Sequence, residues 1–341
     1  MTGIDLDHHG DKDLAPGLID LAVNLRRPQP PQWLRERLIR ETDWASYPDA
    51  APARRAIAEH HGVAEEMVLP LAGAAEGFTL IARALPGPAR VVHPQFTEPE
   101  AALRAAGRDV ERLILTPESG FTLPCPPPLL RAPAGLLVVG NPTNPTGVLH
   151  RRDDLLALPA RALVVDEAFL DAIPGEPETL IAPAMPGRIV LRSLTKTWAL
   201  AGIRVGYAVG DPTLIALLAA HQSPWSVSAS AIVATVACLS GEAAAEARQL
   251  AEQARGHRAD LVARLSAIGL GPVPGRAPFV LVDTASFASA SLREPLAELG
   301  FAVRRGESFP GLGPTWLRLA VRTPDIHRRL AEALLRLKKD D

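Results

Sequence analysis

Cysteine is scarce in this 341-residue chain. The sequence contains only Cys125 and Cys238, which lie far apart and form no CxxC pair. A disulfide framework or a cysteine-based zinc site is therefore not expected, and both residues are predicted to be buried apolar side chains. No metal ion is predicted elsewhere in the chain.

A surplus of charge and a long apolar run are also missing. The 36 lysines and arginines nearly balance the 38 aspartates and glutamates, so no footprint for nucleic acid or a membrane surface is expected. The most apolar region, Thr213 to Leu239, is interrupted by His221, Gln222 and Pro224, and the first residues are polar and acidic. We predict a soluble, cytoplasmic protein without a membrane span or a secretion signal.

Lysine is the third scarce residue. Of the 36 basic residues only four are lysines, and Lys196 is the single lysine between Lys12 and Lys338. Arginine cannot replace lysine where a neutral amine must attack a carbonyl carbon, because the guanidinium group stays charged. Lys196 is therefore a candidate nucleophile, although one surface lysine could also survive by chance, so its neighbours must decide.

Short apolar runs alternate with stretches of helical period in the first two thirds of the chain. The predicted strands, all expected to be parallel, are Val68–Leu71, Arg90–His93, Leu136–Gly140, Leu163–Asp166, Ile189–Leu191 and Val205–Val209. The predicted helices between them include Glu76–Ala84, Glu98–Ala106 and Asp153–Leu158. This alternation predicts an α/β fold with a doubly wound sheet.

The pattern changes after Pro212. A long helix is predicted at Ala243–Ala267, followed by the strands Phe279–Asp283, Ala302–Arg304 and Trp316–Val321 and a closing helix at Ile326–Leu337. We predict a large domain over residues 41–242 and a smaller α+β domain over residues 243–341. Residues 1–40 are expected to contribute to the small domain and to the substrate site.

Polar clusters follow the predicted strands, where ligands of open α/β sheets bind. Ser193, Thr195 and Lys196 follow one strand, with Arg204 eight positions after the lysine. Hydroxyls and a guanidinium around a lone amine suit a site that binds a phosphate and forms a Schiff base, whereas a solvated turn is the plainer interpretation.

The predicted strand Leu163–Asp166 ends in an acidic pair, Asp166 and Glu167. This pattern also occurs in P-loop ATPases, but the chain has no GxxxxGK[ST] string. Asp166 could instead pair with a protonated pyridine nitrogen, or simply cap the next helix.

Three further strings lie at the same predicted edge. The string from Gly140 to Gly147 contains two Asn-Pro steps, and an amide there could donate to a phenolate oxygen. The small residues from Gly73 to Ala75 precede a helix whose free N–H groups could bind a phosphate. Phe96 could stack on a planar cofactor, although a core role is commoner for phenylalanine.

Together these strings resemble the fold-type I pyridoxal-phosphate (PLP) enzymes of the class I/II aminotransferase superfamily, in the same chain order. For the fold, the resemblance implies a large domain with a doubly wound mixed sheet and a smaller α+β domain. The resemblance implies that Lys196 bonds the cofactor aldehyde covalently, that Asp166 pairs with the pyridine nitrogen and that Asn144 pairs with the ring oxygen. The phosphate-binding residues that it implies are Gly73, Ala74, Ala75, Ser193 and Arg204, and Phe96 would cover the ring. It also implies a homodimer, in which Tyr47 reaches the phosphate of the partner subunit.

The substrate-side strings are similar to those of threonine-phosphate decarboxylases of cobalamin biosynthesis. The superfamily usually has tyrosine three residues after the aspartate, and this chain has Phe169, as in that subfamily. The implied substrate residues are His9, Asn24, Arg318 and Arg322, of which Arg318 would hold a carboxylate. For His9, a mobile tail without a function is the competing interpretation.

The resemblance implies PLP-dependent decarboxylation of L-threonine O-3-phosphate to 1-amino-2-propanol phosphate. Histidinol-phosphate aminotransferase is the nearest alternative, because its fold and cofactor site are the same. A non-catalytic cofactor-binding regulator is a further alternative, which the lack of a DNA-binding extension or basic patch disfavours. A scaffold with vestigial motifs is another, which the intact lysine, aspartate, asparagine and arginine disfavour.

Overall fold

The computed structural model describes residues 4–124 and 134–338, which form two β-sheets. Cys125 lies outside the described residues, whereas Cys238 is buried with a free thiol. The larger sheet contains β2 (Val68–Leu71), β3 (Ala89–His93), β4 (Val110–Ile114), β5 (Ala134–Gly140), β6 (Ala160–Asp166), β7 (Arg188–Ser193) and β8 (Gly206–Gly210). The smaller sheet contains β1 (Ile19–Leu21), β9 (Phe279–Asp283), β10 (Phe301–Arg305) and β11 (Trp316–Ala320).

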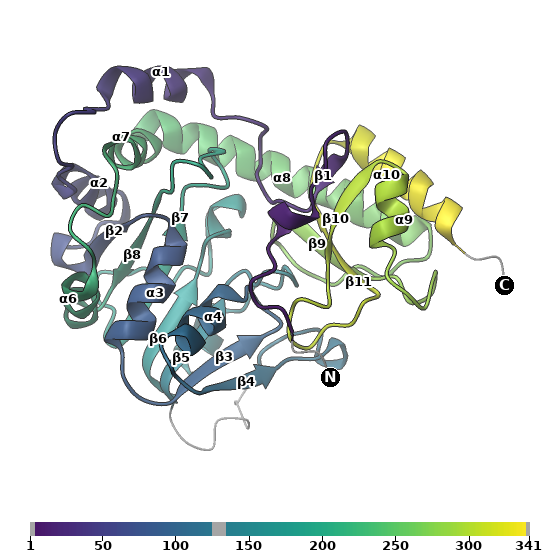
Figure 1. The fold of residues 1–341 in the computed structure, drawn as a ribbon, viewed down its shortest axis with the longest axis horizontal. Coiled ribbons are helices and arrows are strands. Elements are labelled where there is room, and N and C mark those ends of the chain that lie inside the picture. The colour runs from purple at the N-terminus through teal and green to yellow at the C-terminus, as the bar shows by residue number, and fades with distance from the viewer. Residues whose placement is uncertain (1–3, 125–133, 339–341) are drawn as a thin grey trace.

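The helices surround these two sheets (Figure 1). The first seven are α1 (Gln32–Glu41), α2 (Ala51–His61), α3 (Ala74–Ala84), α4 (Glu98–Ala105), α5 (Arg152–Leu156), α6 (Pro212–His221) and α7 (Ala229–Cys238). The last three are α8 (Gly241–Ala267), α9 (Arg293–Glu298) and α10 (Pro324–Leu337), and short 3₁₀ turns occur at Gly10–Asp13, Glu65–Met67, Pro117–Ser119 and Leu170–Ala172. The predicted α/β class is confirmed.

One strand of the larger sheet runs against the others. The strand order is β2-β8-β7-β6-β5-β3-β4, and β8 is antiparallel to both β2 and β7, whereas the pairs from β7 to β4 are parallel. The parallel direction predicted for Val205–Val209 is therefore wrong. The chain passes from β7 to β8 through a loop without a helix, and parallel neighbours need a crossover.

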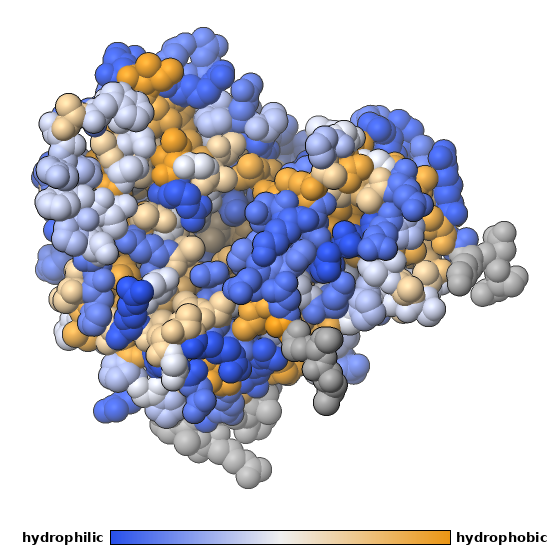
Figure 2. Space-filling model, in the orientation of Figure 1, coloured by the Kyte–Doolittle hydropathy of each residue, from blue (hydrophilic) through white to orange (hydrophobic). Residues whose placement is uncertain are grey.

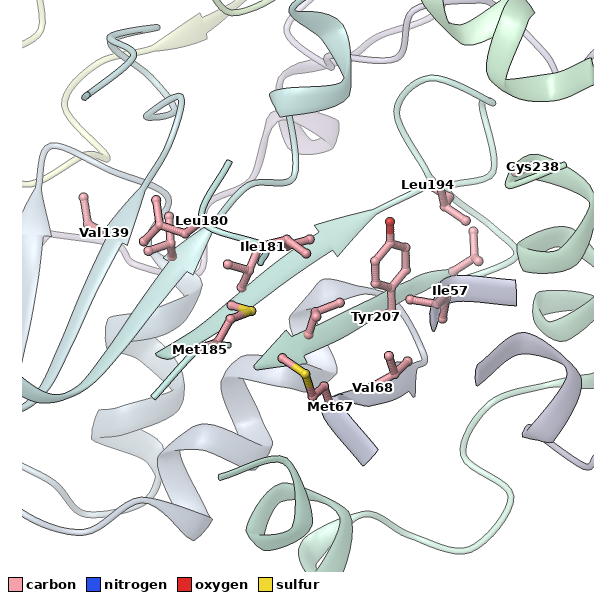
Figure 3. Close-up of a cluster of buried hydrophobic side chains, with 14 of the residues drawn as sticks. Ile57, Met67, Val68, Val139, Leu180, Ile181, Met185, Leu194, Tyr207 and Cys238 are labelled. Carbon is pink, nitrogen blue, oxygen red and sulfur yellow. The ribbon is translucent and has the colours of Figure 1, made fainter. Parts of the chain in front are cut away.

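Helices cover both faces of the larger sheet. In β5, Leu136 and Val138 pack with α3, α4 and α6, whereas Leu137 and Val139 pack with α2 and α7 on the opposite face. Figure 3 shows part of this second cluster, where Tyr207 of β8 lies among aliphatic side chains. Because the central strands are buried on both faces, they appear in the sequence as continuous apolar runs.

The smaller sheet has the order β1-β10-β11-β9 and packs against α8, α9 and α10. The strand β1 is parallel to β10, and the other pairs are antiparallel. Residues 19–21 thus join the smaller sheet, whereas Leu34 of α1 belongs to the core of the larger one. The segment predicted as 1–40 therefore divides between the two sheets.

Among the described residues, no single helix is both long and apolar enough to cross a membrane. The helices α7 and α8 meet that test only as a pair, and they are bent by 74° at their junction.

Candidate active site

Most of the predicted cofactor residues lie at one edge of the larger sheet. Asp166 ends β6, Ser193 ends β7, and Asn144 and Phe96 follow β5 and β3. Arg204 comes before β8, and because β8 is antiparallel, its beginning lies at the edge where its neighbours end. The reversed strand is thus what brings Arg204 to this edge.

Lys196 lies in the loop between β7 and β8. Burial, followed by the positive charges of Arg318 and Arg204, lowers the pKa of its amine to about 8, while Asp166 opposes that shift. The backbone N–H of Arg26 donates to the carbonyl of Lys196 at 3.0 Å. The loop is therefore fastened to the N-terminal segment, and its amine loses a proton far more easily than an ordinary lysine does.

Asp166 is the acid that the sequence predicts beneath the cofactor ring. Burial raises the pKa of its carboxyl to about 6, and a hydrogen bond from the Ala168 N–H to Oδ1 (3.1 Å) and the charge of Lys196 oppose that rise. Among the described residues, no other hydrogen bond to this carboxylate occurs. It therefore remains available to a cationic partner.

Small residues lie beside the guanidinium of Arg204, which is an exposed residue. Gly73 has φ +80°, and a Cβ atom placed on it would lie 2.8 Å from Nη2 of Arg204. Ala74 and Ala75 begin α3, where the first N–H groups have no partner within the helix. A Cβ on Gly206 would lie 2.7 Å from the Ala74 nitrogen, so β8 and α3 meet closely here.

Two hydroxyls lie at the end of β7 and in the loop that follows it. The Ser193 Oγ and Thr195 Oγ1 atoms lie 2.6 Å apart and are buried. Thr195 is not among the predicted site residues, although its hydroxyl directly precedes the lysine. Together with Arg204 and the start of α3, these groups supply a guanidinium, hydroxyls and free N–H donors, which suit a phosphate.

Asn144 and Arg318 are in direct contact. Nη1 of Arg318 donates to Oδ1 of Asn144 at 2.7 Å, and Nη2 donates to the carbonyl of Ala22. The amide NH₂ of Asn144 makes no hydrogen bond to other described residues, so it can donate to a ligand. Burial lowers the pKa of Arg318 to about 9. An anion that paired with this guanidinium would offset the free-energy cost of burying its charge.

Aromatic rings lie on two sides of the site. The rings of His9 and Phe96 are 5.5 Å apart, and His9 Nε2 lies 3.6 Å from Glu98 Oε2. Phe169 packs edge-on against Phe279 at 5.0 Å, and the Arg318 guanidinium lies over that second ring. His9 is thus ordered at the site rather than in a free tail, and Phe169 contributes no hydroxyl.

The remaining predicted substrate residues are placed differently. Asn24 is buried, and its Oδ1 atom has no hydrogen-bond partner among the described residues. Arg322 donates to the carbonyls of Asp20, Val23 and Leu25, so its guanidinium holds the N-terminal segment. These two residues line a cavity of about 900 Å³ beside α8, which Lys196, Asp166 and Asn144 do not line.

Tyr47 does not reach the site of its own chain. Its side chain is 78% exposed and stacks on the exposed ring of Trp225, with 4.4 Å between the centroids. Either residue is therefore free to contact another subunit.

The structure contains a polar network next to the lysine loop that the sequence did not predict. Nη1 of Arg26 donates to Thr197 Oγ1 at 3.0 Å, and the Thr197 hydroxyl donates to the carboxylate of Asp171. Burial raises the pKa of Asp171, which the Arg26 charge opposes. Residues 26, 171 and 197 lie far apart in the sequence, so no local sequence pattern could reveal the network.

The comparisons with known proteins agree on one family. The model for aminotransferase class I and II matches residues 16–334. Histidinol-phosphate aminotransferase from Mycobacterium tuberculosis (strain ATCC 25618 / H37Rv) is 46% identical over 321 residues, covering 92% of this chain and 86% of that protein. Threonine-phosphate decarboxylase from a Sinorhizobium species is 33% identical over 316 residues, covering 88% and 87%.

A solved structure supports the same conclusion for the fold. Aspartate aminotransferase from Thermus thermophilus with maleate is similar with a TM-score of 0.81 and 26% identity, covering 94% of this chain and 92% of that one.

Proposed function

This chain belongs to the class I and II aminotransferase family, and from that premise we propose that it decarboxylates L-threonine O-3-phosphate with pyridoxal phosphate as cofactor. The family and its fold-type I members use this cofactor. Membership of the family supports a PLP-dependent enzyme that acts on a small amine. The specific reaction and its substrate are what we propose.

The residues present fit the cofactor. A lysine amine has a pKa of about 8 and a buried acid lies near it, and the Arg204 guanidinium lies beside Gly73 at the start of α3. These groups provide an amine, a carboxylate and candidate phosphate donors along one sheet edge. A side chain at position 73 would fill the space beside the guanidinium. Lys196 would bond the cofactor, Asp166 and Asn144 would hold its ring, and Arg204 and Ser193 would hold its phosphate.

When bound, PLP supplies an aldehyde for the amine and a ring that accepts the electrons of a broken Cα bond. Asp166 keeps a negative charge in a buried position and so stabilises a proton on the opposing ring nitrogen. A free Lys196 amine would serve as a base or an acid at Nζ near neutral pH. Arg318 would orient a substrate carboxylate, and Asn144 would be held in place by Arg318.

The observation that carries the choice of decarboxylation is Phe169. This residue stands where the superfamily usually has a tyrosine, packs against Phe279 and has no hydroxyl, as the resemblance to threonine-phosphate decarboxylases implies. The relatives support a phosphorylated substrate more broadly, because both are named for a compound that has a phosphate ester and an amine.

Transamination of histidinol phosphate is the second candidate. The 46% identity to an enzyme of that name, over 92% of this chain, favours it. The two reactions break different bonds at Cα: decarboxylation breaks the bond to the carboxylate, and transamination breaks the bond to hydrogen. Histidinol phosphate has no carboxylate, so Arg318 would then serve the second substrate, a dicarboxylic amino or keto acid.

The two reactions differ in products that can be measured directly. The purified, PLP-loaded protein is expected to release CO₂ from L-threonine O-3-phosphate without any keto acid. Turnover of histidinol phosphate that depends on 2-oxoglutarate, with no CO₂ from threonine phosphate, would establish the second candidate instead.

We also propose a homodimer in which Tyr47 reaches the cofactor phosphate of the partner subunit. Tyr47 and Trp225 expose a stacked aromatic pair, and Trp44 close by is 80% exposed. Exposed aromatic groups of this kind are typical of subunit interfaces.

A further inference from the structure

The carboxylate of Asp13 is surrounded by cations. It ends the 3₁₀ turn Gly10–Asp13, and its side chain is 1% exposed. Four groups approach its oxygens: His8 Nε2 at 3.1 Å, Arg304 Nη1 at 3.4 Å, Arg305 Nε at 3.4 Å and Arg293 Nη1 at 3.9 Å. One carboxylate of the N-terminal segment thus pairs with three arginines that lie beside or within the smaller sheet.

Arg304 depends on this acid most. Its side chain is 3% exposed, and its guanidinium lies over the ring of Phe309. The second nitrogen donates to the carbonyl of His8 at 2.5 Å. A buried guanidinium needs a compensating charge, and among the described residues Asp13 is the carboxylate within ion-pair distance of it.

The same segment is fastened to the larger sheet from its other side. The Thr97 hydroxyl donates to the carbonyl of Leu6 at 2.6 Å, and His9 lies against the ring of Phe96. A Cβ atom on Gly10 would lie 2.5 Å from the Ala22 carbonyl, which also accepts from Arg318. We call residues 4–27 the N-terminal strap, because they connect the two sheets next to the site.

The surface agrees with this placement. Figure 2 shows hydrophilic residues gathered where the strap, purple in Figure 1, crosses between the two sheets, beside a recess. The end of the strap that contains Leu21 is held by apolar burial and by the pairing of β1 with β10. The part from Leu6 to Asp13 is held by the ion pairs and hydrogen bonds described above.

We propose that Asp13 is a positioning residue: through Arg304 it fastens the N-terminal strap across the active-site edge and so holds His9 against Phe96. Asp13 touches neither the lysine nor the cofactor residues, and it acts through the strap. The effect on turnover rests on the proposed function, whereas the fastening does not.

Because the chain has few lysines, proteolytic cleavage after Lys12 can measure how firmly the strap is held. Lys12 lies within the turn that Asp13 ends, and its Nζ donates to the Asp7 carbonyl at 2.7 Å. Lysyl endopeptidase needs an unfolded segment around its target lysine. Lys196 lies in the interior loop, and Lys338 and Lys339 are at the end of the chain, so a cut after Lys12 is identified by mass.

Asp13→Asn in the PLP-loaded protein should increase the rate of cleavage after Lys12 at least tenfold, and Asp13→Glu should restore part of the protection. Asp325→Asn, which removes an exposed carboxylate paired with Arg328 on α10, is the matched control and should cleave like the wild type. Residue 13 directly follows the cleaved bond, so Arg304→Gln is the second variant: it removes the partner of Asp13 and leaves the residues at the cleaved bond unchanged. It should also increase the rate of cleavage after Lys12.

A second measurement connects the strap to the reaction. Asp13→Asn should raise KM for the phosphorylated substrate more than it lowers kcat, because the strap borders the binding edge. Cleavage after Lys12 that is no faster in Asp13→Asn, or in Arg304→Gln, than in the wild type would overturn the proposal. Absence of turnover with both candidate substrates would count against the proposed function and leave the cleavage result valid.

Discussion

At the residue scale, the central feature is an amine that is easily deprotonated. The charges of two arginines and two acids act on Lys196, and burial contributes the largest shift of its pKa. The ordinary pKa of a lysine, about 10.4, would leave very little neutral amine at neutral pH. A pKa of about 8 leaves roughly a tenth of it neutral at pH 7, which is enough to react with an aldehyde.

This shift predicts how the cofactor-free protein captures PLP. The capture rate should rise about tenfold per pH unit below pH 8 and level off above it, because only the neutral amine attacks. Stopped-flow absorbance between pH 6 and 10 measures it. In Asp166→Asn the midpoint should move to lower pH, since the carboxylate favours the protonated amine. A midpoint near 10.5 in the wild type would contradict this explanation.

A second prediction concerns Gly73. Alanine there meets both an unfavourable positive φ and the Arg204 guanidinium. Gly73→Ala should cost about 1–2 kcal/mol of the free energy of unfolding and weaken PLP binding about tenfold. Gly269→Ala, where φ is +91° and no atom lies within 4 Å, is the control.

The control should lose stability without losing PLP affinity. Urea unfolding and fluorescence titration measure the two quantities. Equal PLP affinity in wild type and Gly73→Ala would show that Gly73 does not lie at the phosphate site.

At the scale of elements, an ion pair ties together the ends of two strands that carry cofactor residues. Nη2 of Arg192 lies 2.9 Å from Glu167 Oε2, and Nη1 lies 2.6 Å from Glu176 Oε2. Glu167 follows Asp166, and Arg192 precedes Ser193. The pair therefore fixes the ends of β6 and β7 relative to each other.

Arg192→Met should lower the free energy of unfolding by about 3–5 kcal/mol, because Glu167 would remain buried without its partner. The double variant Glu167→Gln/Arg192→Met should lose less than the sum of the two single variants, since no charge is then left alone. Chemical denaturation of the cofactor-free proteins measures both. A loss below about 1 kcal/mol in Arg192→Met would mean that the pair does not hold these strands.

The strands could be predicted from the sequence because each is a local apolar run. Phe279–Asp283 and Val68–Leu71 have the predicted bounds, and the long helix begins two residues before the prediction. The reversed β8 was missed, since direction depends on the path of the connecting loop rather than on the run itself. The exposed strand β4 was missed as well, because its side chains are only half-buried and form no apolar run.

The cofactor residues could be proposed from motifs, but several contacts among them could not. The contact of Arg318 with the Ala22 carbonyl and the ion pair of Asp13 with Arg304 join residues almost 300 positions apart. Such contacts follow from the packing of the strap between the sheets, and they leave no local signature.

At the scale of the whole molecule, the proposed dimer should be visible in solution. Trp44→Asp places a charge in the exposed aromatic surface formed by Trp44, Tyr47 and Trp225, and should convert the dimer to a monomer. Leu335→Asp changes an exposed apolar residue on α10 and is the control. Sedimentation velocity measures both, and a wild-type protein that sediments as a monomer at micromolar concentration would refute the dimer.

The predicted boundary near residue 242 falls at the start of α8, a helix that runs along both sheets (Figure 1). The two domains remain a prediction from sequence. The strap and α8 are the segments that connect the sheets, so any motion of one sheet against the other must involve them.

The central claim is that Lys196 bonds the cofactor. Reducing the PLP-loaded protein with borohydride and mapping its peptides tests this claim most directly, because the chain has only four lysines. The cofactor mass should appear on the peptide that contains residue 196 and be absent from those with Lys12 and Lys338. An unmodified residue 196, with or without label elsewhere, would contradict the claim.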